Sequence, residues 1–392
     1  MRKATPALAL TMLMLVTSCN ADVLPWPFEV HQLTDNDGDD EGPDVDNGNI
    51  VWSGPGGGSS EIYLWDGSTT TRLSTNAVGD WTPRIHAGSV VWDRGDQIVY
   101  WDGSDETLLT GTSTSDYLPV VHDGQVAWRR TDSAGDSWAY FWDGSYSGSD
   151  PFIRQLGRDS GESYPMIRNG KVVWSGWDGS DGEIALWNGT SVEYLTDDTV
   201  HDYGPVWVGD NQVAWLGGPS AGYAVMLWDN GSVSEIHPSG SDLAGDGDEL
   251  CWISADADGS QIFYWDGDAV QQVTFGSGHT LMEPVVSDGK VAWLERDGFD
   301  YDVFAWDGSS IYQITDNDWT DAHVQISGDW LAWESEVGGS RFDPRDLEIM
   351  TTRFPEPATA AMLGTGLVGI FWRRRRSMTK TNGDTREARI GT

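Results

Sequence analysis

Cysteine is nearly absent from this chain of 392 residues, which contains only Cys19 and Cys251. If Cys19 lies in an export signal, the mature chain cannot form an internal disulfide. Basic residues are also few, because 23 Lys and Arg stand against 62 Asp and Glu, for a formal net charge of −39. A surface this acidic repels nucleic acid and attracts cations, so a nucleic-acid partner is not expected.

Catalytic motifs are lacking as well. The 7 histidines form no His-x-x-x-His or His-Glu pair with the spacing of metal ligands. The sequence has no Gly-x-Ser-x-Gly elbow and no phosphate-binding loop. A binding or structural role is therefore favoured over an enzyme, although His201 and His323 lie in or beside acidic loops where a lyase-like site could form.

A repeat dominates the rest of the sequence. The segment Ile62-Tyr63-Leu64-Trp65-Asp66-Gly67 returns in varied form along the chain. Its tryptophans are Trp65, Trp101, Trp142, Trp187, Trp228, Trp265 and Trp306, which are 36, 41, 45, 41, 37 and 41 residues apart. A period near 40 residues indicates one supersecondary unit that is built many times.

Each repeat predicts four strands. The first is an apolar strand that follows a Pro and leads to a Gly turn. The second is a strand that ends in Trp, the third is the Trp-Asp-Gly strand, and the fourth ends near Leu-Thr. Strands such as residues 62–65 are apolar on both faces and need cover on both sides. The eighth repeat lacks a fourth strand, and residues 28–34 match one.

This pattern resembles the TolB-type and WD-repeat β-propellers. We therefore predict an all-β, closed β-propeller of eight four-stranded blades over residues 28–353, whose last blade is completed by the N-terminal strand. Seven blades remain the alternative, because the sixth repeat is divergent at its start.

The N-terminal residues resemble an export signal. Arg2 and Lys3 precede an apolar run over residues 7–16, so residues 1–21 are predicted to be a signal peptide. Residues 16–19 also resemble a bacterial lipobox, in which Cys19 would be lipidated.

The C-terminal residues carry a second targeting pattern. Pro355, Glu356 and Pro357 precede a short apolar segment, residues 360–372, and then Arg373, Arg374, Arg375 and Arg376. Residues 354–376 resemble the PEP-CTERM sorting tail of Gram-negative bacteria. The resemblance implies transient anchoring in the inner membrane through a short transmembrane segment, processing by an exosortase and delivery to the cell surface, often in strains that make exopolysaccharide. The polar tail, residues 377–392, departs from the family pattern.

The loops before the repeated Pro are acidic. Three residues before each Pro stand Asp40, Asp80, Asp116, Glu162 and Asp202. These residues are predicted to form a ring near one mouth of the channel, where carboxylate oxygens would suit Ca²⁺. Asp35, Asp37 and Asp39 resemble the start of a calcium-binding loop. The alternative is that all these side chains cap turns and face water.

These observations predict a secreted, surface-sorted propeller that binds an extracellular polysaccharide or another envelope protein, with Ca²⁺ holding its acidic face together. The alternatives are a lyase or hydrolase acting on polysaccharide, and a purely structural surface component. Trp81, Trp207 and Trp319 stand outside the two repeated tryptophan columns, and packing rather than sugar stacking is their expected role.

Overall fold

The computed structural model describes residues 23–111, 115–147, 150–161, 164–218, 223–255, 259–276, 278, 280–337 and 346–354. These residues form strands, turns and loops and contain no helix, so the all-β prediction is confirmed. No described segment is a helix long and apolar enough to span a membrane. The predicted signal peptide, Cys19, Glu162 and the sorting signal lie outside the described residues.

The first part of the chain forms two four-stranded sheets and one eight-stranded sheet. The four-stranded sheets are β3 (Glu41–Asp46), β4 (Asn49–Pro55), β5 (Ser60–Trp65), β6 (Thr70–Arg72), and β7 (Asp80–His86), β8 (Ser89–Arg94), β9 (Gln97–Trp101), β10 (Glu106–Leu108). The eight-stranded sheet comprises β11 (Ser115–His122), β12 (Gln125–Thr131), β13 (Ser137–Ser147), β14 (Asp150–Asp159), β15 (Met166–Arg168), β16 (Lys171–Trp177), β17 (Gly182–Trp187) and β18 (Val192–Tyr194). A single bridge, Asp159 to Gly176, joins its two four-stranded halves.

The second part forms four further sheets. They are β19 (Tyr203–Val208), β20 (Gln212–Gly217), β21 (Ala224–Asp229), β22 (Ser232–His237); then β23 (Ser241–Asp246), β24 (Glu249–Ala255), β25 (Ser260–Trp265), β26 (Val270–Gln272); then β27 (Leu281–Ser287), β28 (Lys290–Asp297), β29 (Asp300–Trp306), β30 (Ile311–Gln313); and β31 (Asp321–Ser327), β32 (Trp330–Val337), β33 (Asp346–Arg353). Two N-terminal strands join these sheets. β1 (Leu24–Pro25) runs parallel to β30, and β2 (His31–Gln32) runs antiparallel to β33.

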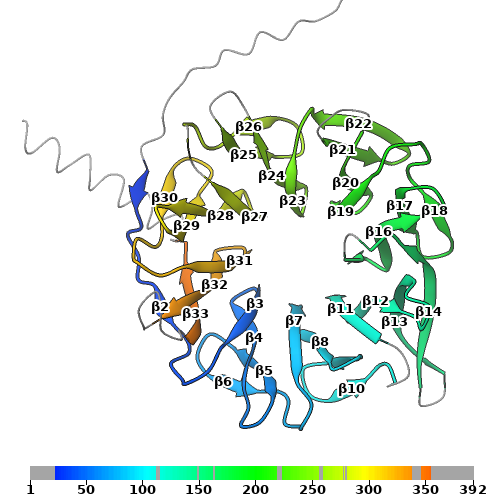
Figure 1. Ribbon diagram of the computed structural model, residues 1–392, viewed down its shortest axis with the longest axis horizontal. Helices are drawn as coiled ribbons and strands as arrows, with labels where there is room; N and C mark the ends of the chain where they lie inside the picture. The colour runs from blue at the N-terminus through cyan, green and yellow to red at the C-terminus, as the bar shows by residue number, and fades with distance from the viewer. Residues whose placement is uncertain are drawn as a thin grey trace, which may run out of the picture.

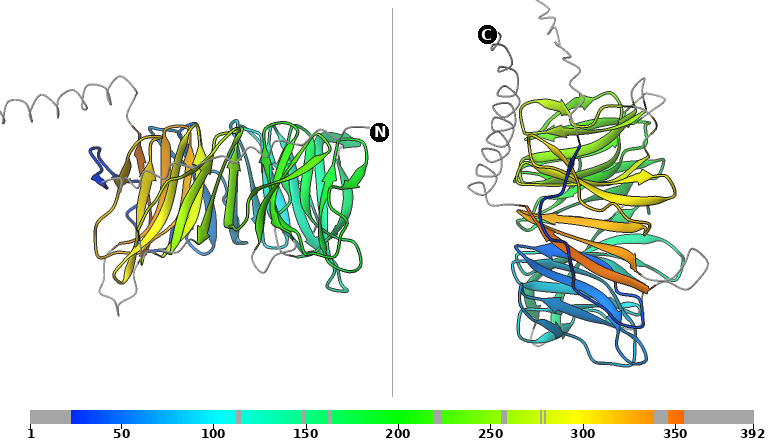
Figure 2. Two further views of the ribbon diagram at one scale, coloured as in Figure 1. Left: turned by 90° about the horizontal axis from the view of Figure 1, so that it is seen from above. Right: turned by 90° about the vertical axis from the view of Figure 1, so that its left-hand side faces the viewer.

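The sheets are arranged around a common centre as in a β-propeller (Figure 1). Their first strands face the centre, and each contacts the first strand of the next sheet, including β31 with β3. Figure 2 shows the same sheets from the side, standing next to one another with twisted strands. Among the described strands, hydrogen bonding closes no sheet on itself.

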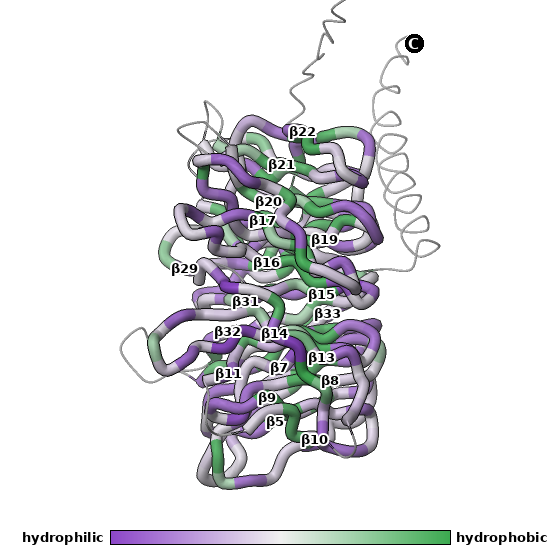
Figure 3. Tube along the Cα trace, turned by 90° about the vertical axis from the view of Figure 1, so that its right-hand side faces the viewer, coloured by the Kyte–Doolittle hydropathy of each residue, from purple (hydrophilic) through white to green (hydrophobic). Residues whose placement is uncertain are grey.

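The core lies between neighbouring sheets. In each repeat the second strand buries its Trp to 1% exposure or less, at Trp52, Trp92, Trp128, Trp174, Trp215, Trp252, Trp293 and Trp333. Trp92, for example, packs with Val51 and Ile62 of the preceding sheet. Each buried Trp removes roughly 150–250 Å² from water, which corresponds to at most about 4–6 kcal/mol. Figure 3 shows hydrophobic stretches within the strands and hydrophilic stretches in the loops.

The Trp-Asp-Gly segments end in tight turns. In the first of them, the Asp66 carboxylate accepts hydrogen bonds from the amides of Ser68 and Thr69, at 2.9 and 2.8 Å. Gly67 has a φ of 92°, which a residue with a side chain rarely adopts. A side-chain oxygen acceptor and a glycine with positive φ therefore turn the chain between the third and fourth strands, and Asn188 supplies the acceptor in the sheet of β17.

A bulge recurs in the first strands, and the sequence did not reveal it. The bulged residue lies just before the Pro position and has a positive φ at Thr82 (50°), Leu118 (57°), Glu283 (52°) and His323 (51°). The register of each strand against its neighbour shifts there. Because a bulge re-aims the residues that follow it, it decides which side chains face the centre.

Candidate binding site in the central cavity

Four of the five aspartate and glutamate residues predicted to form a ring are described, and all four are buried. Asp40, Asp80, Asp116 and Asp202 have exposures of 1, 0, 0 and 3%. The indole Nε1 of Trp52 donates to Asp40 Oδ1 at 2.9 Å, and that of Trp128 donates to Asp116 Oδ1 at 2.9 Å. Asp40 and Asp116 therefore anchor the core tryptophans of their own sheets, whereas the indole nitrogens of Trp92 and Trp215 are buried without a hydrogen-bond partner.

The residue two positions after the core tryptophan determines how each carboxylate is accommodated. Arg94 Nε lies 2.8 Å from Asp80 Oδ1, and Arg130 Nε lies 2.5 Å from Asp116 Oδ1. Where Gly217 stands instead, a Cβ would lie 1.6 Å from Asp202 Oδ1. Burial raises the pKa of Asp202 to about 6. Each carboxylate is thus balanced by a guanidinium or shifted towards its neutral form.

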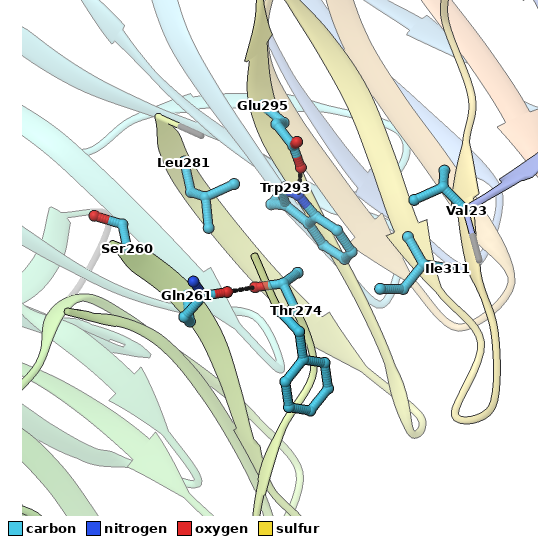
Figure 4. Close-up of a pocket in the computed structure, with 9 residues that line it drawn as sticks. Val23, Ser260, Gln261, Thr274, Leu281, Trp293, Glu295 and Ile311 are labelled. Carbon is cyan, nitrogen blue, oxygen red and sulfur yellow. Dashed lines mark hydrogen bonds between the residues drawn. The ribbon is translucent and has the colours of Figure 1, made fainter. Parts of the chain in front are cut away.

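One further sheet follows this pattern without the Pro, and another lacks the acidic residue. Asp321, which the sequence analysis missed because Val324 replaces the Pro, is buried and accepts a hydrogen bond from Thr315 Oγ1 at 2.6 Å. Leu281 takes the acidic position in β27, and Trp293 Nε1 instead donates to Glu295 at 3.2 Å. Figure 4 shows this contact beside a small cavity of about 70 Å³ between neighbouring sheets, which is far smaller than a typical ligand site.

The remaining sequence candidates are exposed or half-buried, with the exception of Trp207. Asp35, Asp37 and Asp39 are exposed, and Asp39 accepts a hydrogen bond from the Leu347 amide at 3.2 Å. His201 accepts a hydrogen bond from the Gly182 amide at 2.9 Å. Trp81 and Trp319 are 44 and 36% exposed, whereas Trp207 is buried at 4%.

A cavity of about 640 Å³ lies at the centre, within the range of small-molecule sites. It is lined largely by apolar residues of the first strands, together with a few charged groups. The charged and titratable residues that line it are Asp44, Arg84, His86, His122, Tyr164, Arg168 and Asp246. Two guanidinium groups and two imidazoles therefore gather inside a chain with a formal net charge of −39.

Arg84 is the less neutralised of the two guanidinium groups. Its Nη1 donates to the Pro83 carbonyl at 2.8 Å, and it forms no ion pair with any carboxylate in the described part of the chain. Nearby Asp44 accepts a hydrogen bond from the Ile85 amide, and burial raises the pKa of Asp44 despite the attraction of Arg84. Arg168 lies 3.5 Å from Asp210, whose side chain is 69% exposed. Both guanidiniums are therefore available to an anion.

His86 and His122 end strands β7 and β11 at one mouth of the cavity. Their rings stack with centroids 4.1 Å apart and planes inclined by 20°. The Asp123 amide donates to His86 Nδ1 at 3.0 Å, while His122 Nδ1 is buried without a hydrogen-bond partner. Burial lowers the pKa of His122, and the neighbouring His86 lowers it further. The sequence held a signal, because both histidines stand three residues after a repeated Pro.

Two described groups of three residues place their ligand atoms within 4.8 Å of one another, close enough to hold one ion. The first is His86, His122 and Asp123, and the second is Asp178, Asp181 and Glu183. The predicted aspartates Asp40, Asp80, Asp116 and Asp202 belong to neither group.

Comparison with known proteins identifies one targeting motif. Residues 355–376 match the PEP-CTERM protein-sorting motif, as the sequence pattern predicted. The motif indicates an exported protein that is sorted to the cell surface and implies processing by an exosortase-type enzyme. No curated protein matches the chain.

Solved structures show the fold. The β-propeller domain of the Trilobed protease from Pyrococcus furiosus has a TM-score of 0.51 and 8% identity, over 81% of this chain and 95% of that one. An acylaminoacyl peptidase from Pyrococcus horikoshii has a TM-score of 0.51 and 11% identity, over 82% of this chain and 53% of that one. This chain thus spans about half the length of the second protein. Identities this low establish the β-propeller fold alone.

Proposed function

We propose that this protein is a secreted, surface-sorted binding module that takes an anionic group of an extracellular polysaccharide, or of another envelope protein, into its central cavity. The observation that carries the proposal is the gathering of Arg84, Arg168, His86 and His122 in one cavity of a strongly acidic protein. Guanidinium groups bind carboxylate and phosphate through charge-assisted hydrogen bonds, which are stronger in a cavity than in open water. A uronic acid residue has this chemistry.

The architecture we propose for this module is a closed ring of eight four-stranded blades. The two halves of the eight-stranded sheet count as separate blades, because one bridge joins them. Strand β2 would complete the last blade, which is supported by the pairing of His31 with Thr351 and of Gln32 with Met350. Contacts between the first strands β31 and β3 support closure of the ring.

The targeting route belongs to the same proposal. The chain would enter the envelope of a Gram-negative bacterium through its signal peptide. The apolar segment of residues 360–372 would then hold it in the inner membrane until an exosortase cuts the tail. Lipidation of Cys19 would be an alternative anchor.

The first prediction concerns anion binding. Replacing Arg84 or Arg168 with Gln is expected to weaken the binding of trigalacturonate by about tenfold or more, since a hydrogen bond to a charged group contributes roughly 1.5–3 kcal/mol. Isothermal titration calorimetry at low salt would measure the affinity. The matched control is Arg154→Gln, because Arg154 is 39% exposed and lies outside the cavity. Equal affinity of all three variants, or equal binding of neutral maltotriose, would contradict the proposal.

Calcium would stabilise this module, and we propose Asp178, Asp181 and Glu183 as the ligands. Glu183 has 0% exposure, and its Oε2 has no hydrogen-bond partner. Its counterpart in the first sheet, Glu61, lies 2.8 Å from Arg72 Nη2, whereas Tyr194 takes the place of that arginine beside Glu183. Burial raises the pKa of Glu183. A hard divalent cation would supply the missing positive charge.

The second prediction tests this calcium site. Millimolar Ca²⁺ is expected to raise the melting temperature by several degrees and EDTA to reverse the rise, because a ligand at 100 times its Kd stabilises by about 2.7 kcal/mol. Asp181→Asn should abolish the shift. Asp66→Asn is the matched control, since Asp66 forms the same Asp-Gly-Ser turn without the two further carboxylates. If Asp80→Asn or Asp116→Asn abolished the rise in melting temperature and Asp181→Asn did not, the calcium site would instead be the ring of aspartates predicted from the sequence.

A polysaccharide lyase or hydrolase is the second candidate function. It is favoured by one contact, in which His323 Nδ1 lies 2.9 Å from Glu334 Oε2 while Glu283 accepts a hydrogen bond from the His323 amide. Glu334 raises the pKa of His323. The test is whether the protein releases new reducing ends from a uronate polymer. If it does, and if the His323→Gln variant does not, the protein is an enzyme rather than a binding module. A purely structural surface component would bind neither trigalacturonate nor a second protein.

A further inference from the structure

The histidine pair at the cavity mouth has the ligand set of a transition-metal site. His86 Nδ1 lies 3.5 Å from Asp123 Oδ1, and His122 Nδ1 lies 3.5 Å from Asp123 Oδ2. The side chains of His86 and His122 are 33 and 19% exposed, and that of Asp123 is 57% exposed, so solvent reaches the group. Imidazole nitrogens with one carboxylate are the donors that hold zinc in many three-ligand sites.

We propose that His86, His122 and Asp123 bind a divalent transition-metal ion, of which Zn²⁺ is the representative, at the mouth of the central cavity. The ion would be held by two neighbouring sheets, because His86 ends β7 whereas His122 and Asp123 lie at the end of β11. It differs from the calcium site both in its residues and in the softness of its ligands.

The distances fit an ion better than direct hydrogen bonds. At 3.5 Å, each nitrogen–oxygen separation exceeds the ~2.7–3.2 Å of a good hydrogen bond. Zinc bonds of ~2.0–2.1 Å at tetrahedral angles place neighbouring ligand atoms about 3.4 Å apart. These two distances end on different oxygens of Asp123, and one ligand atom from each of the three side chains lies within 4.8 Å of the others. Small side-chain rotations would therefore bring all three to the spacing that a shared ion requires.

The second observation is the unsatisfied nitrogen of His122. Its Nδ1 is buried and has no hydrogen-bond partner, and a buried polar atom in that state costs about 1–3 kcal/mol. An ion would satisfy this atom directly.

Binding would change one existing contact. His86 Nδ1 now accepts the Asp123 amide at 3.0 Å and would exchange that proton for the ion. Asp123 lies in an exposed turn with a φ of 48°, so its freed amide can turn to water at little cost. Three protein ligands leave a fourth position open, which would take water or an anion. Ion binding itself is independent of the proposed anionic ligand.

The third prediction tests this site on the purified protein without added saccharide. Titration with Zn²⁺ is expected to show one tight site, and Co²⁺ is expected to give the intense visible absorption of a tetrahedral complex. His122→Gln should weaken Zn²⁺ binding at least tenfold and abolish the Co²⁺ spectrum. Asp123→Asn should also weaken binding. His31→Gln is the matched control, since His31 is exposed and lies outside the group.

The results separate this proposal from the proposed function. Arg84→Gln should leave Zn²⁺ affinity unchanged while it weakens trigalacturonate binding, because Arg84 is not a ligand. Unchanged Zn²⁺ affinity in His122→Gln, with a circular dichroism spectrum identical to that of the parent, would overturn the metal site. A weak, octahedral Co²⁺ spectrum in the parent protein would overturn it too.

Discussion

Raising the pH from 5 to 8 is expected to lower the melting temperature of this protein substantially. Burial raises the pKa of Asp93 and Asp302 to about 7, and that of Asp40, Asp202 and Asp321 to about 6. In the unfolded chain these groups titrate near pH 4. The folded state therefore binds more protons than the unfolded state between about pH 4 and 7, and stability falls as the pH rises through that window.

The size of this effect is large because several groups act together. One pKa unit corresponds to about 1.4 kcal/mol, so the five carboxyls contribute several kcal/mol below pH 4 that are lost by pH 8. His122 acts in the opposite sense, because a lowered imidazole pKa favours the folded state as the pH rises. Its single contribution is smaller than that of the five carboxyls. Thermal unfolding at intervals of one pH unit would measure the slope.

Asp93 provides the control for this prediction. Its Oδ2 accepts hydrogen bonds from Thr82 Oγ1 at 2.6 Å and from the Leu118 amide at 3.3 Å, while Oδ1 has no partner. Asp93→Asn keeps the shape and removes the titrating group, so the decline between pH 5 and 8 should become shallower. Asp66→Asn, at an exposed turn, should leave the slope unchanged over this range. A stability that rises from pH 5 to 8 would contradict the prediction.

Replacing Arg129 with Met is expected to destabilise the protein by about 3–5 kcal/mol, because it leaves a buried carboxylate without its charge partner. Arg129 and Asp159 are 7 and 4% exposed. Arg129 Nη2 lies 3.0 Å from Asp159 Oδ1, and Nε lies 3.3 Å from Oδ2. The pair stands where the two halves of the eight-stranded sheet meet, since Asp159 bridges to Gly176.

Two further variants make this result specific. The double variant Arg129→Met with Asp159→Leu should recover most of the lost stability, because no buried charge remains. Arg158→Met removes the exposed Arg158–Asp136 pair, whose side chains are 44 and 41% exposed, and should cost less than about 1 kcal/mol. Urea unfolding midpoints would measure all three. A double variant as unstable as the single one would show that packing, rather than charge, holds the junction.

The sequence predicted the all-β propeller because its signals are local and repeated. Residues 62–65 are apolar on both faces, which only a sheet covered on both sides can bury. The Asp66-Gly67 turn requires the carboxylate acceptor and the positive φ that the structure contains. The sorting motif could also be recognised from the sequence, because its Pro-Glu-Pro, apolar and arginine elements are contiguous in the chain.

The candidate site could not be derived in the same way. The sequence predicts that the acidic residues before each Pro form a ring near one mouth of the channel. In the structure, Asp80 and Asp116 are instead buried and pair with Arg94 and Arg130. The bulge at Thr82 and its counterparts sets which side chains face the centre, and no residue type marks it.

The sequence itself thus determined the strand periodicity, the tight turns and the sorting signal, since each depends on residues that are close together along the chain. Only the tertiary structure brought His86 and His122 together from neighbouring sheets and gathered Arg84 and Arg168 around one cavity. The packing of neighbouring sheets places equivalent positions of different repeats side by side, and that proximity is a property of the assembled sheets rather than of any one repeat.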